Sequence, residues 1–88
     1  MVDKLIALDY DGTYTADPPL WNSFIQAATK SGHRVICITM RTPQESIQIP
    51  CDVYYTSRKA KIPFMRDLGI KVNIWIDDMP ELLFQGAG

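Results

Sequence analysis

The chain is poor in the residues on which several common kinds of active site depend. It has one histidine, His33, and two cysteines, Cys37 and Cys51, in 88 residues. Zinc sites built from clusters of His and Cys are therefore excluded, as are Ser-His-Asp triads. With so few thiols and no export signal, we expect both cysteines to be reduced, in or near the core, in a cytoplasmic protein.

Strong charge of either sign and long hydrophobic runs are also missing. The formal net charge is -1, so there is no basic patch to attract nucleic acid or an anionic membrane. No apolar run approaches the roughly 20 residues that a membrane-spanning helix needs. The length of 88 residues and the hydrophobic content of 47% predict a single domain, residues 1–88, with one core.

Short apolar runs alternate with segments of helical spacing, which is typical of β-α-β units and a parallel sheet. The runs predict strands over Leu5–Leu8, Val35–Ile38, Val53–Tyr55 and Val72–Ile76. We predict an α/β three-layer sandwich with a Rossmann-like parallel sheet of about four strands, in the spatial order 3-2-1-4. The first two strands are expected in the centre of the sheet and the third at an edge.

Capping signals mark the expected helices. They predict helices that begin near Pro18, Thr42, Pro63 and Asp78. The first has Asp17 as its N-cap and ends at Gly32, and the third ends at Gly69. The second rests on the capping-box spacing of Thr42 and Glu45.

Acidic side chains follow the ends of the first and last predicted strands. Asp9 and Asp11 follow the first strand, and Asp77 and Asp78 follow the last. Right-handed crossovers bring these strand ends to one edge of the sheet, where α/β folds bind their ligands. Carboxylates so close together raise one another's pKa unless a cation or a chemical task offsets the repulsion. The pattern favours a Mg²⁺ site over a solvated Asp-Gly turn, although the last pair alone could be a helix N-cap.

Hydroxyl and cationic side chains are expected at the same edge. Thr39 ends the second strand, and Lys59 and Lys61 lie just before the third helix. A phosphoryl group needs positive charge and hydrogen-bond donors around it, so these residues indicate a phosphorylated substrate. Each lysine alone could be a solvated surface residue, and Lys61 is preferred because it is nearer the helix start. Arg41 and Arg58 are either further substrate contacts or solvated.

The order of these residues resembles that of the haloacid dehalogenase-like (HAD) superfamily, specifically its phosphatases. The family's four motifs are matched by Asp9-Tyr10-Asp11-Gly12-Thr13, by Thr39, by Lys61 or Lys59, and by Trp75-Ile76-Asp77-Asp78. The resemblance extends from Leu5 to Glu81, and its first motif, Asp-x-Asp-Gly-Thr, is the specific one.

The resemblance implies a Mg²⁺-dependent phosphatase. Asp9 would attack phosphorus and form an aspartyl-phosphate, while Asp11 would protonate the leaving oxygen and then deprotonate the attacking water. A carboxylate oxygen of Asp9, the backbone carbonyl of Asp11 and the side chain of Asp77 would hold Mg²⁺. Asp78 would support them, and Thr39 with one lysine would bind the phosphoryl oxygens.

Larger members of this superfamily carry a cap domain that selects the substrate, and this chain has no room for one. We therefore expect an open site, or one that a neighbouring subunit covers. A homo-oligomer would also cover apolar surface, for which Tyr14, Trp21 and Tyr54 are the candidates. A sugar phosphate, a nucleotide, a phosphorylated polymer end and a phosphoprotein would all suit an open site.

Two other functions compete with the phosphatase. One is a phosphoacceptor module like a receiver domain, which also combines acidic residues, Thr and Lys on a parallel sheet. Receivers have an adjacent acidic pair at the first strand, so the one-residue gap between Asp9 and Asp11 disfavours this reading. The other is a catalytically inactive subunit that binds Mg²⁺ or phosphate within an assembly. All the catalytic residue types are present, which disfavours it.

Overall fold

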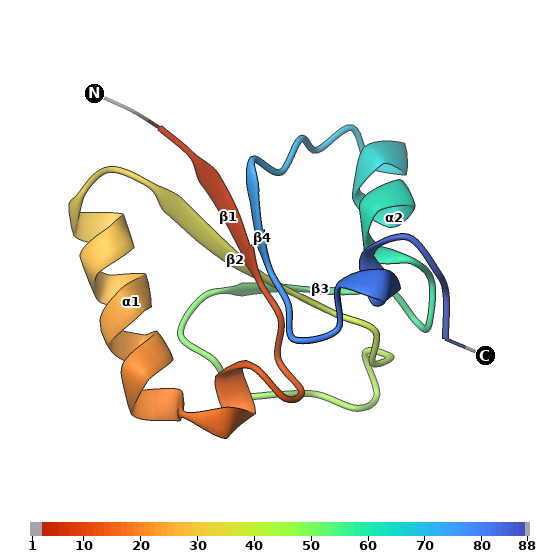
Figure 1. Ribbon diagram of the computed structural model, residues 1–88, viewed down its shortest axis with the longest axis horizontal. Helices are drawn as coiled ribbons and strands as arrows, with labels where there is room; N and C mark the ends of the chain where they lie inside the picture. The colour runs from red at the N-terminus through yellow and green to blue at the C-terminus, as the bar shows by residue number, and fades with distance from the viewer. Residues whose placement is uncertain (1–2, 88) are drawn as a thin grey trace.

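One parallel sheet of four short strands forms the centre of the computed structural model, which describes residues 3–87. Met1, Val2 and Gly88 of the predicted domain lie outside the described residues. The strands are β1 (Leu5–Leu8), β2 (Arg34–Thr39), β3 (Asp52–Tyr55) and β4 (Ile74–Ile76). They pair in the order β3-β2-β1-β4 (Figure 1). The predicted parallel sheet, its strand order and the edge position of the third strand are confirmed.

Two α-helices, α1 (Pro18–Lys30) and α2 (Lys61–Asp67), cover opposite faces of this sheet (Figure 1). The predicted three-layer, Rossmann-like α/β arrangement is therefore confirmed. Two short 3₁₀-helices, η1 (Tyr14–Ala16) and η2 (Pro80–Leu83), follow β1 and β4. Only residues 9–17 separate β1 from α1 and only residues 56–60 separate β3 from α2, so neither connection holds a cap domain. None of the helices in residues 3–87 has the length and apolarity needed to cross a bilayer.

The two central strands are buried on both faces, because each face is covered by a helix. Ile6, Leu8 and Val35 belong to the core cluster beneath α1. Ala7 and Ile36 belong to the cluster beneath α2. Since successive side chains of a strand point to opposite faces, an uninterrupted apolar run supplies both clusters at once.

The sequence signals around α1 act as predicted. The Asp17 carboxylate accepts the backbone N–H of Leu20 at 3.3 Å, and Gly32, just beyond the helix, has a φ of +94°. Trp21 and Phe24 pack edge to face, with ring centroids 5.6 Å apart, against the core beneath the helix. Both aromatic residues are core residues, as their spacing indicates.

The aromatic residues proposed for an interface between copies lie largely within the chain's own core. Tyr14 is buried and its hydroxyl donates to Asn22 Oδ1 at 2.7 Å. Trp21 and Tyr54 are half-buried against the two core clusters. Tyr14 is therefore not available to a partner, whereas the choice of Trp21 and Tyr54, and oligomerisation itself, stay predictions. Within residues 3–87, the exposed large apolar side chains are Leu20, Leu68, Ile74, Met79 and Phe84.

The short helix predicted to begin at Thr42 is wrong, because residues 42–45 form only a turn. The capping contacts do form: the Thr42 N–H donates to Glu45 Oε1 at 2.8 Å, and the Glu45 N–H donates to Thr42 O at 2.9 Å. The turn does not continue as a helix, since the β-branched Ile49 and then Pro50 follow. Arg58 donates to Glu45 Oε2 at 3.0 Å and so ties the turn to the segment after β3.

Three other boundaries differ from those predicted. Helix α2 begins at Lys61 rather than Pro63, because proline is tolerated within a first turn whose N–H groups have no acceptor in the helix. Strand β4 is shorter than predicted, since Asn73 accepts the Leu5 N–H through its side chain, at 2.8 Å. The last helix is only the 3₁₀ turn η2, preceded by Asp77, whose Oδ1 accepts the Met79 N–H at 3.0 Å.

The two thiols are expected to react slowly in the native protein and at different rates. Burial raises the pKa of Cys37 to about 12 and that of the half-buried Cys51 to about 11. Because the thiolate is the reactive form, we expect slow reaction with a disulfide reagent at about pH 8, Cys51 before Cys37. Cys51→Ser should slow the native reaction further. A Cys37 thiol that reacts equally fast in native and urea-unfolded protein would contradict its place in the core.

Candidate functional site

Lys61, the first residue of α2, is buried between two carboxylates. Its Nζ donates to Asp9 Oδ1 and to Asp77 Oδ2, both at 2.7 Å. The exposed fraction of the side chain is 2% for Lys61, 9% for Asp9 and 3% for Asp77. Helix α2 is thus joined to the ends of β1 and β4 by one charged contact from which water is nearly excluded.

The pairing of β1 with β4 sets the distance between the two acidic segments. Leu8 and Ile76, the last residues of the two strands, are partners in the sheet. The Asp9 N–H donates to Ile76 O at 2.9 Å and extends the pairing beyond the strands. Asp9 and Asp77 therefore leave the sheet side by side, which explains how one lysine reaches both.

Thr13 connects Asp78, two residues beyond β4, to Asp9. Its hydroxyl oxygen lies 3.1 Å from Asp9 Oδ2 and 3.2 Å from Asp78 Oδ1, and it accepts the Asp78 N–H at 3.2 Å. A hydroxyl has one proton, so it donates to one of these carboxylates at a time. Thr13 had no predicted role beyond its membership of the first motif. The signal that could have found it is its fixed place in the Asp-x-Asp-Gly-Thr motif.

Gly12 allows the close approach of the β1 loop to Asp78. Its φ of +84° lies in the left-handed region, and a Cβ at this position would collide with the Asp78 carboxylate. Its N–H donates to Thr15 Oγ1 at 2.9 Å, which holds the turn. Glycine is thus required here both for the backbone conformation and for space.

Asp11 pairs with Arg41 and takes no part in the buried contact of Lys61. Arg41 donates through Nε to Asp11 Oδ2 at 2.9 Å and through Nη2 to Oδ1 at 2.8 Å. These hydrogen bonds hold the pKa of Asp11 below its usual value, although burial acts in the opposite direction. The paired guanidinium also lies over the ring of Tyr10, with Cζ 5.4 Å from the centroid. Arg41, left undecided by the sequence, is therefore part of the site.

A small pocket brings the other predicted residues together. It has a volume of about 120 Å³ and is lined by Asp9, Asp11, Thr39, Met40, Lys61, Asp77, Asp78, Met79 and Leu82. A cavity of this volume has room for a few small groups. A phosphoryl group is of that size, whereas a sugar or nucleoside would have to remain outside.

Thr39 and the two predicted lysines take different positions with respect to this pocket. The Thr39 side chain is buried, and its hydroxyl accepts the Arg41 N–H at 3.3 Å, which leaves the hydroxyl proton for a ligand. Lys61 lines the pocket, whereas Lys59 is exposed and does not. The geometry therefore favours Lys61 over Lys59 as the cation of the site.

Burial and ion pairing act against each other in this pocket. Burial raises the pKa of Asp9 to about 6, although its hydrogen bond with Lys61 lowers it. Burial lowers the pKa of Lys61, but its hydrogen bonds to Asp77 and Asp9 outweigh this effect and raise it. The lysine therefore remains charged. Four carboxyl groups, those of Asp9, Asp11, Asp77 and Asp78, accompany the two cations Lys61 and Arg41, and one divalent cation would balance this excess of acidic groups.

The carboxylates of Asp9, Asp77 and Asp78 fit a hard divalent cation. Each offers one oxygen, and these oxygens lie within 4.8 Å of one another. Mg²⁺ binds through few carboxylates when a phosphate supplies further oxygens, and an all-oxygen set without His or Cys suits it. The Asp11 carboxylate does not belong to this group. Asp11 would therefore bind the cation only through its backbone carbonyl.

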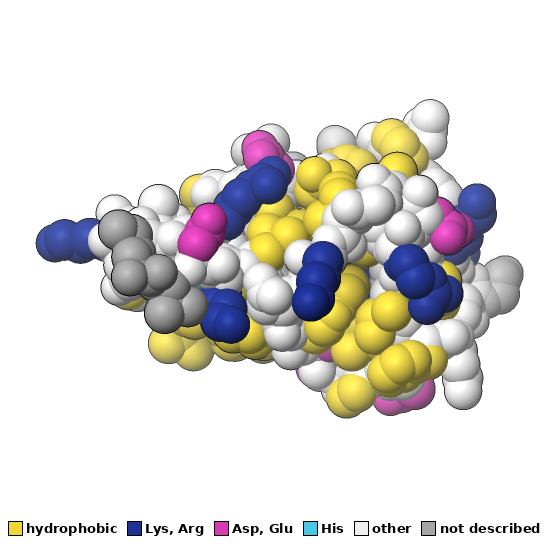
Figure 2. Space-filling view, turned by 90° about the horizontal axis from the view of Figure 1, so that it is seen from above, with side chains coloured by type: hydrophobic (Ala, Val, Ile, Leu, Met, Phe, Trp, Pro, Cys, Tyr) yellow, Lys and Arg dark blue, Asp and Glu magenta, His cyan; other side chains and the backbone are white. Residues whose placement is uncertain are grey.

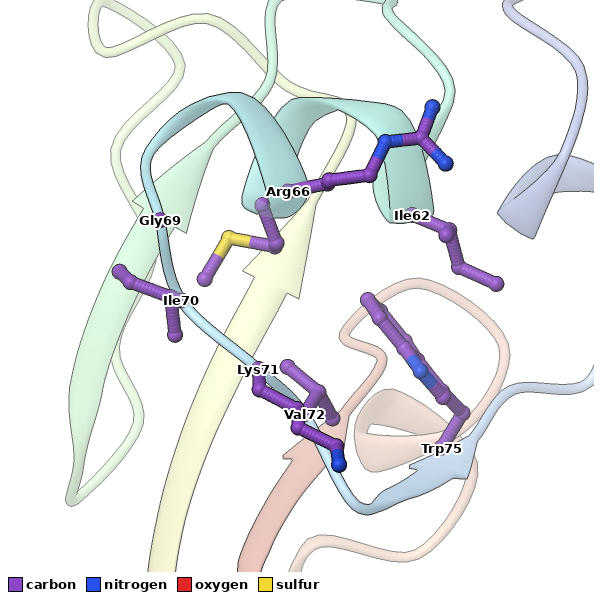
Figure 3. Close-up of a pocket in the computed structure, with 8 residues that line it drawn as sticks. Ile62, Arg66, Gly69, Ile70, Lys71, Val72 and Trp75 are labelled. Carbon is purple, nitrogen blue, oxygen red and sulfur yellow. The ribbon is translucent and has the colours of Figure 1, made fainter.

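A larger hollow lies beside α2, but it holds none of these groups. Its volume is about 380 Å³, and it is lined by Ile62, Met65, Arg66, Gly69, Ile70, Lys71, Val72 and Trp75 (Figure 3). On the face seen in Figure 2, hydrophobic side chains likewise lie among Lys and Arg side chains. No carboxylate lines the hollow, so it is apolar surface separate from the acidic pocket.

Comparisons with models of protein families, with curated proteins and with solved structures gave no significant match to this chain. The function therefore has to be argued from the chemistry of the pocket. Its distinguishing features are the buried contact of Lys61 with Asp9 and Asp77, and the exposed pair of Asp11 with Arg41.

Replacement of Lys61 by Met should destabilise the fold strongly. Asp9 and Asp77 would then be buried without their partner, and removing one member of a buried ion pair typically costs about 3–5 kcal/mol. Urea unfolding without metal should show this loss, and added Mg²⁺ should restore part of it. The matched control is Lys59→Met, at an exposed lysine, which should change stability little. Equal stability of the two variants would contradict the central role of Lys61.

Replacement of Gly12 by Ala should displace Asp78. The variant bears a left-handed backbone strain of about 1–2 kcal/mol and also the collision with the carboxylate. Gly69→Ala is the control, because Gly69 has a similar φ of +76° and open space around it. We expect both variants to be destabilised, but only Gly12→Ala to bind Mg²⁺ more weakly in calorimetry. Equal Mg²⁺ affinity of the two variants would argue against Asp78 as a ligand.

Proposed function

We propose that this protein is a Mg²⁺-dependent phosphatase of the HAD type, which hydrolyses phosphate monoesters through an aspartyl-phosphate on Asp9. The observation that carries the proposal is the environment of Asp9. It is a buried carboxylate that Lys61 keeps ionised, in a pocket of phosphoryl size beside Asp77 and Asp78. A desolvated carboxylate with a raised pKa is a better nucleophile than a solvated one, provided that it remains ionised.

The reaction proceeds in two steps. A carboxylate oxygen of Asp9 bonds to phosphorus, the bond from phosphorus to the ester oxygen breaks, and that oxygen takes a proton from Asp11. Water then bonds to phosphorus, gives a proton to Asp11, and the acyl phosphate bond to Asp9 breaks. Inorganic phosphate and an alcohol are released, and both carboxyl groups return to their starting states.

Donors from two elements hold the phosphoryl group in this mechanism. Lys61 supplies positive charge from the start of α2, and Thr39 supplies a hydroxyl proton from the end of β2. When bound, Mg²⁺ would neutralise the negative charge of Asp9, Asp77 and Asp78 and allow an anionic substrate to enter. Without such a cation the pocket would repel phosphate, which supports the metal requirement.

Asp11 has to leave Arg41 and take up a proton from solvent before it can act as the acid of the first step. In the ion pair its two oxygens accept from the guanidinium, and its pKa is lowered. The pair is exposed, with 35% of the Arg41 side chain and 56% of the Asp11 side chain accessible. Exposed ion pairs contribute little net stability, so Asp11, which already lines the pocket, can exchange Arg41 for the leaving oxygen at little cost.

The leaving group is expected to lie outside the protein's pocket. The pocket holds little more than a phosphoryl group. Both small esters and the phosphorylated ends of larger molecules are therefore candidate substrates. We also propose a cytoplasmic location, which the free thiols of Cys37 and Cys51 support. Coverage of the open site by a second copy of the chain remains part of the proposal.

Asp9→Asn should abolish turnover of a generic phosphate monoester, because no nucleophile remains. Asp11→Asn should reduce turnover by about 10²- to 10⁴-fold, the usual contribution of general acid–base catalysis. It should also accumulate phosphate on Asp9 from an activated ester, since hydrolysis of the intermediate loses its base. Steady-state assays with Mg²⁺ and intact-protein mass spectrometry would measure both effects. The control is Asp52→Asn, at an exposed residue that begins β3.

Near-normal turnover by Asp9→Asn would overturn the covalent mechanism and reduce Asp9 to a metal ligand. Stable phosphorylation of the wild-type chain by a small phosphodonor, without turnover, would instead support a receiver-like module. Binding of Mg²⁺ and phosphate with neither reaction would support an inactive subunit.

A further inference from the structure

Arg41 is next to the phosphoryl-sized pocket, because it follows Met40 and makes a bidentate contact with Asp11, and both of these residues line the pocket. Both oxygens of Asp11 accept from its guanidinium, at 2.9 and 2.8 Å. This geometry is also the one in which arginine binds a free carboxylate or phosphate. Asp11 thus occupies the place of an anionic ligand on Arg41.

The guanidinium is positioned by its surroundings independently of Asp11. It lies over the ring of Tyr10, which stacks on Tyr14 at a centroid distance of 5.6 Å. The Arg41 backbone carbonyl accepts the Ser57 N–H at 3.3 Å, and the preceding carbonyl accepts the Arg58 N–H at 2.8 Å. The Arg41 guanidinium would therefore keep its position next to the pocket after Asp11 has left it.

We propose that Arg41 binds a second anionic group of the substrate, which replaces the Asp11 carboxylate and releases Asp11 toward the leaving oxygen. The preferred substrates are then phosphate monoesters with a carboxylate or a second phosphate close to the scissile group. This inference rests on the proposed phosphatase function and narrows its substrate class. The scissile phosphoryl group is bound by Lys61 and Thr39, so Arg41 is a specificity-determining residue.

Matched esters test the inference directly. We would compare monophosphates and bisphosphates of unbranched alkanediols with two, three and four carbons, as substrates with Mg²⁺. Charge-assisted hydrogen bonds to a second anion should raise kcat/KM for the best bisphosphate by roughly 10- to 100-fold over its monophosphate. In Arg41→Met this preference should disappear through a rise in KM for the bisphosphate that exceeds any change for the monophosphate. Arg41→Lys should keep only part of this preference, because lysine lacks the planar guanidinium that forms two parallel hydrogen bonds.

The control variant is Arg34→Met. Arg34 is an exposed arginine at the amino end of β2, 3.6 Å from Asp52, and its loss should leave the preference intact. A second readout that needs no turnover is calorimetric binding of the same esters to Asp9→Asn, with and without Arg41→Met. The bisphosphate should bind more tightly only when Arg41 is present.

Each outcome separates the inference from the proposed function. Turnover of all esters without a preference, or a preference that survives in Arg41→Met, would overturn the inference and leave the phosphatase standing. An equal loss of turnover for both esters in Arg41→Met would assign Arg41 to the scissile group instead. Absence of any turnover would overturn the phosphatase. In that case, tighter binding of the bisphosphate that depends on Arg41 would still support the contact of Arg41 with a second anion. Equal binding of the two esters would contradict that contact.

Discussion

The buried contact of Lys61 with Asp9 and Asp77 is the interaction on which the site depends. It joins α2 to the carboxyl ends of the two strands that deliver the acidic residues. Burial of any one of these charges alone would be costly, but together they are paired and hydrogen-bonded. The arrangement therefore requires that helix, strand register and side chains be correct at the same time.

The segment before α2 is shaped to deliver Lys61 to this position. Ser57 and Arg58 have positive φ values of 53° and 72°, unusual for residues with a side chain. The buried Thr56 donates its hydroxyl proton to Lys59 O at 2.8 Å, and Arg58 donates to Met40 O at 2.9 Å. These contacts compensate for the backbone strain. They also connect the start of α2 to the segment that carries Arg41, so the two cations of the site share one support.

The excess of negative charge makes the site a compromise between stability and function. Two cations accompany the carboxylates of Asp9, Asp11, Asp77 and Asp78. A fold selected for stability alone would neutralise or disperse such a group. Under the proposed function, a divalent cation and then an anionic substrate would bind to this excess of acidic groups. The small pocket and the exposed pair of Asp11 and Arg41 fit this reading. The rest of the substrate, with any further charged group, would lie outside the pocket, near Arg41.

Much of the fold followed from the chain's own pattern, and the errors have local causes. Apolar runs placed all four strands, since side chains of a strand covered on both faces must be apolar throughout. Asp17 and Gly32 marked the limits of α1 correctly, because capping depends on neighbouring residues. The turn at Thr42 was mistaken for a helix, although its capping contacts are present. Whether this turn continues as a helix depends on the residues that follow it and on the contact with Arg58. Neither can be recognised from the capping residues themselves.

The sequence by itself determined which segments would meet at the carboxyl edge of the sheet, because chain order and crossover handedness restrict the topology of a parallel sheet. It also determined that the groups there would be carboxylates, a hydroxyl and a lysine. Only the tertiary structure decided between Lys59 and Lys61, placed Thr13 between Asp9 and Asp78, and turned Asp11 toward Arg41. Lys61 and Asp9 are 52 positions apart, and Arg41 and Asp11 are 30 apart. Contacts over such separations follow from strand register, the first turn of α2 and the rotamers of long side chains, and none of these is encoded by neighbouring residues alone.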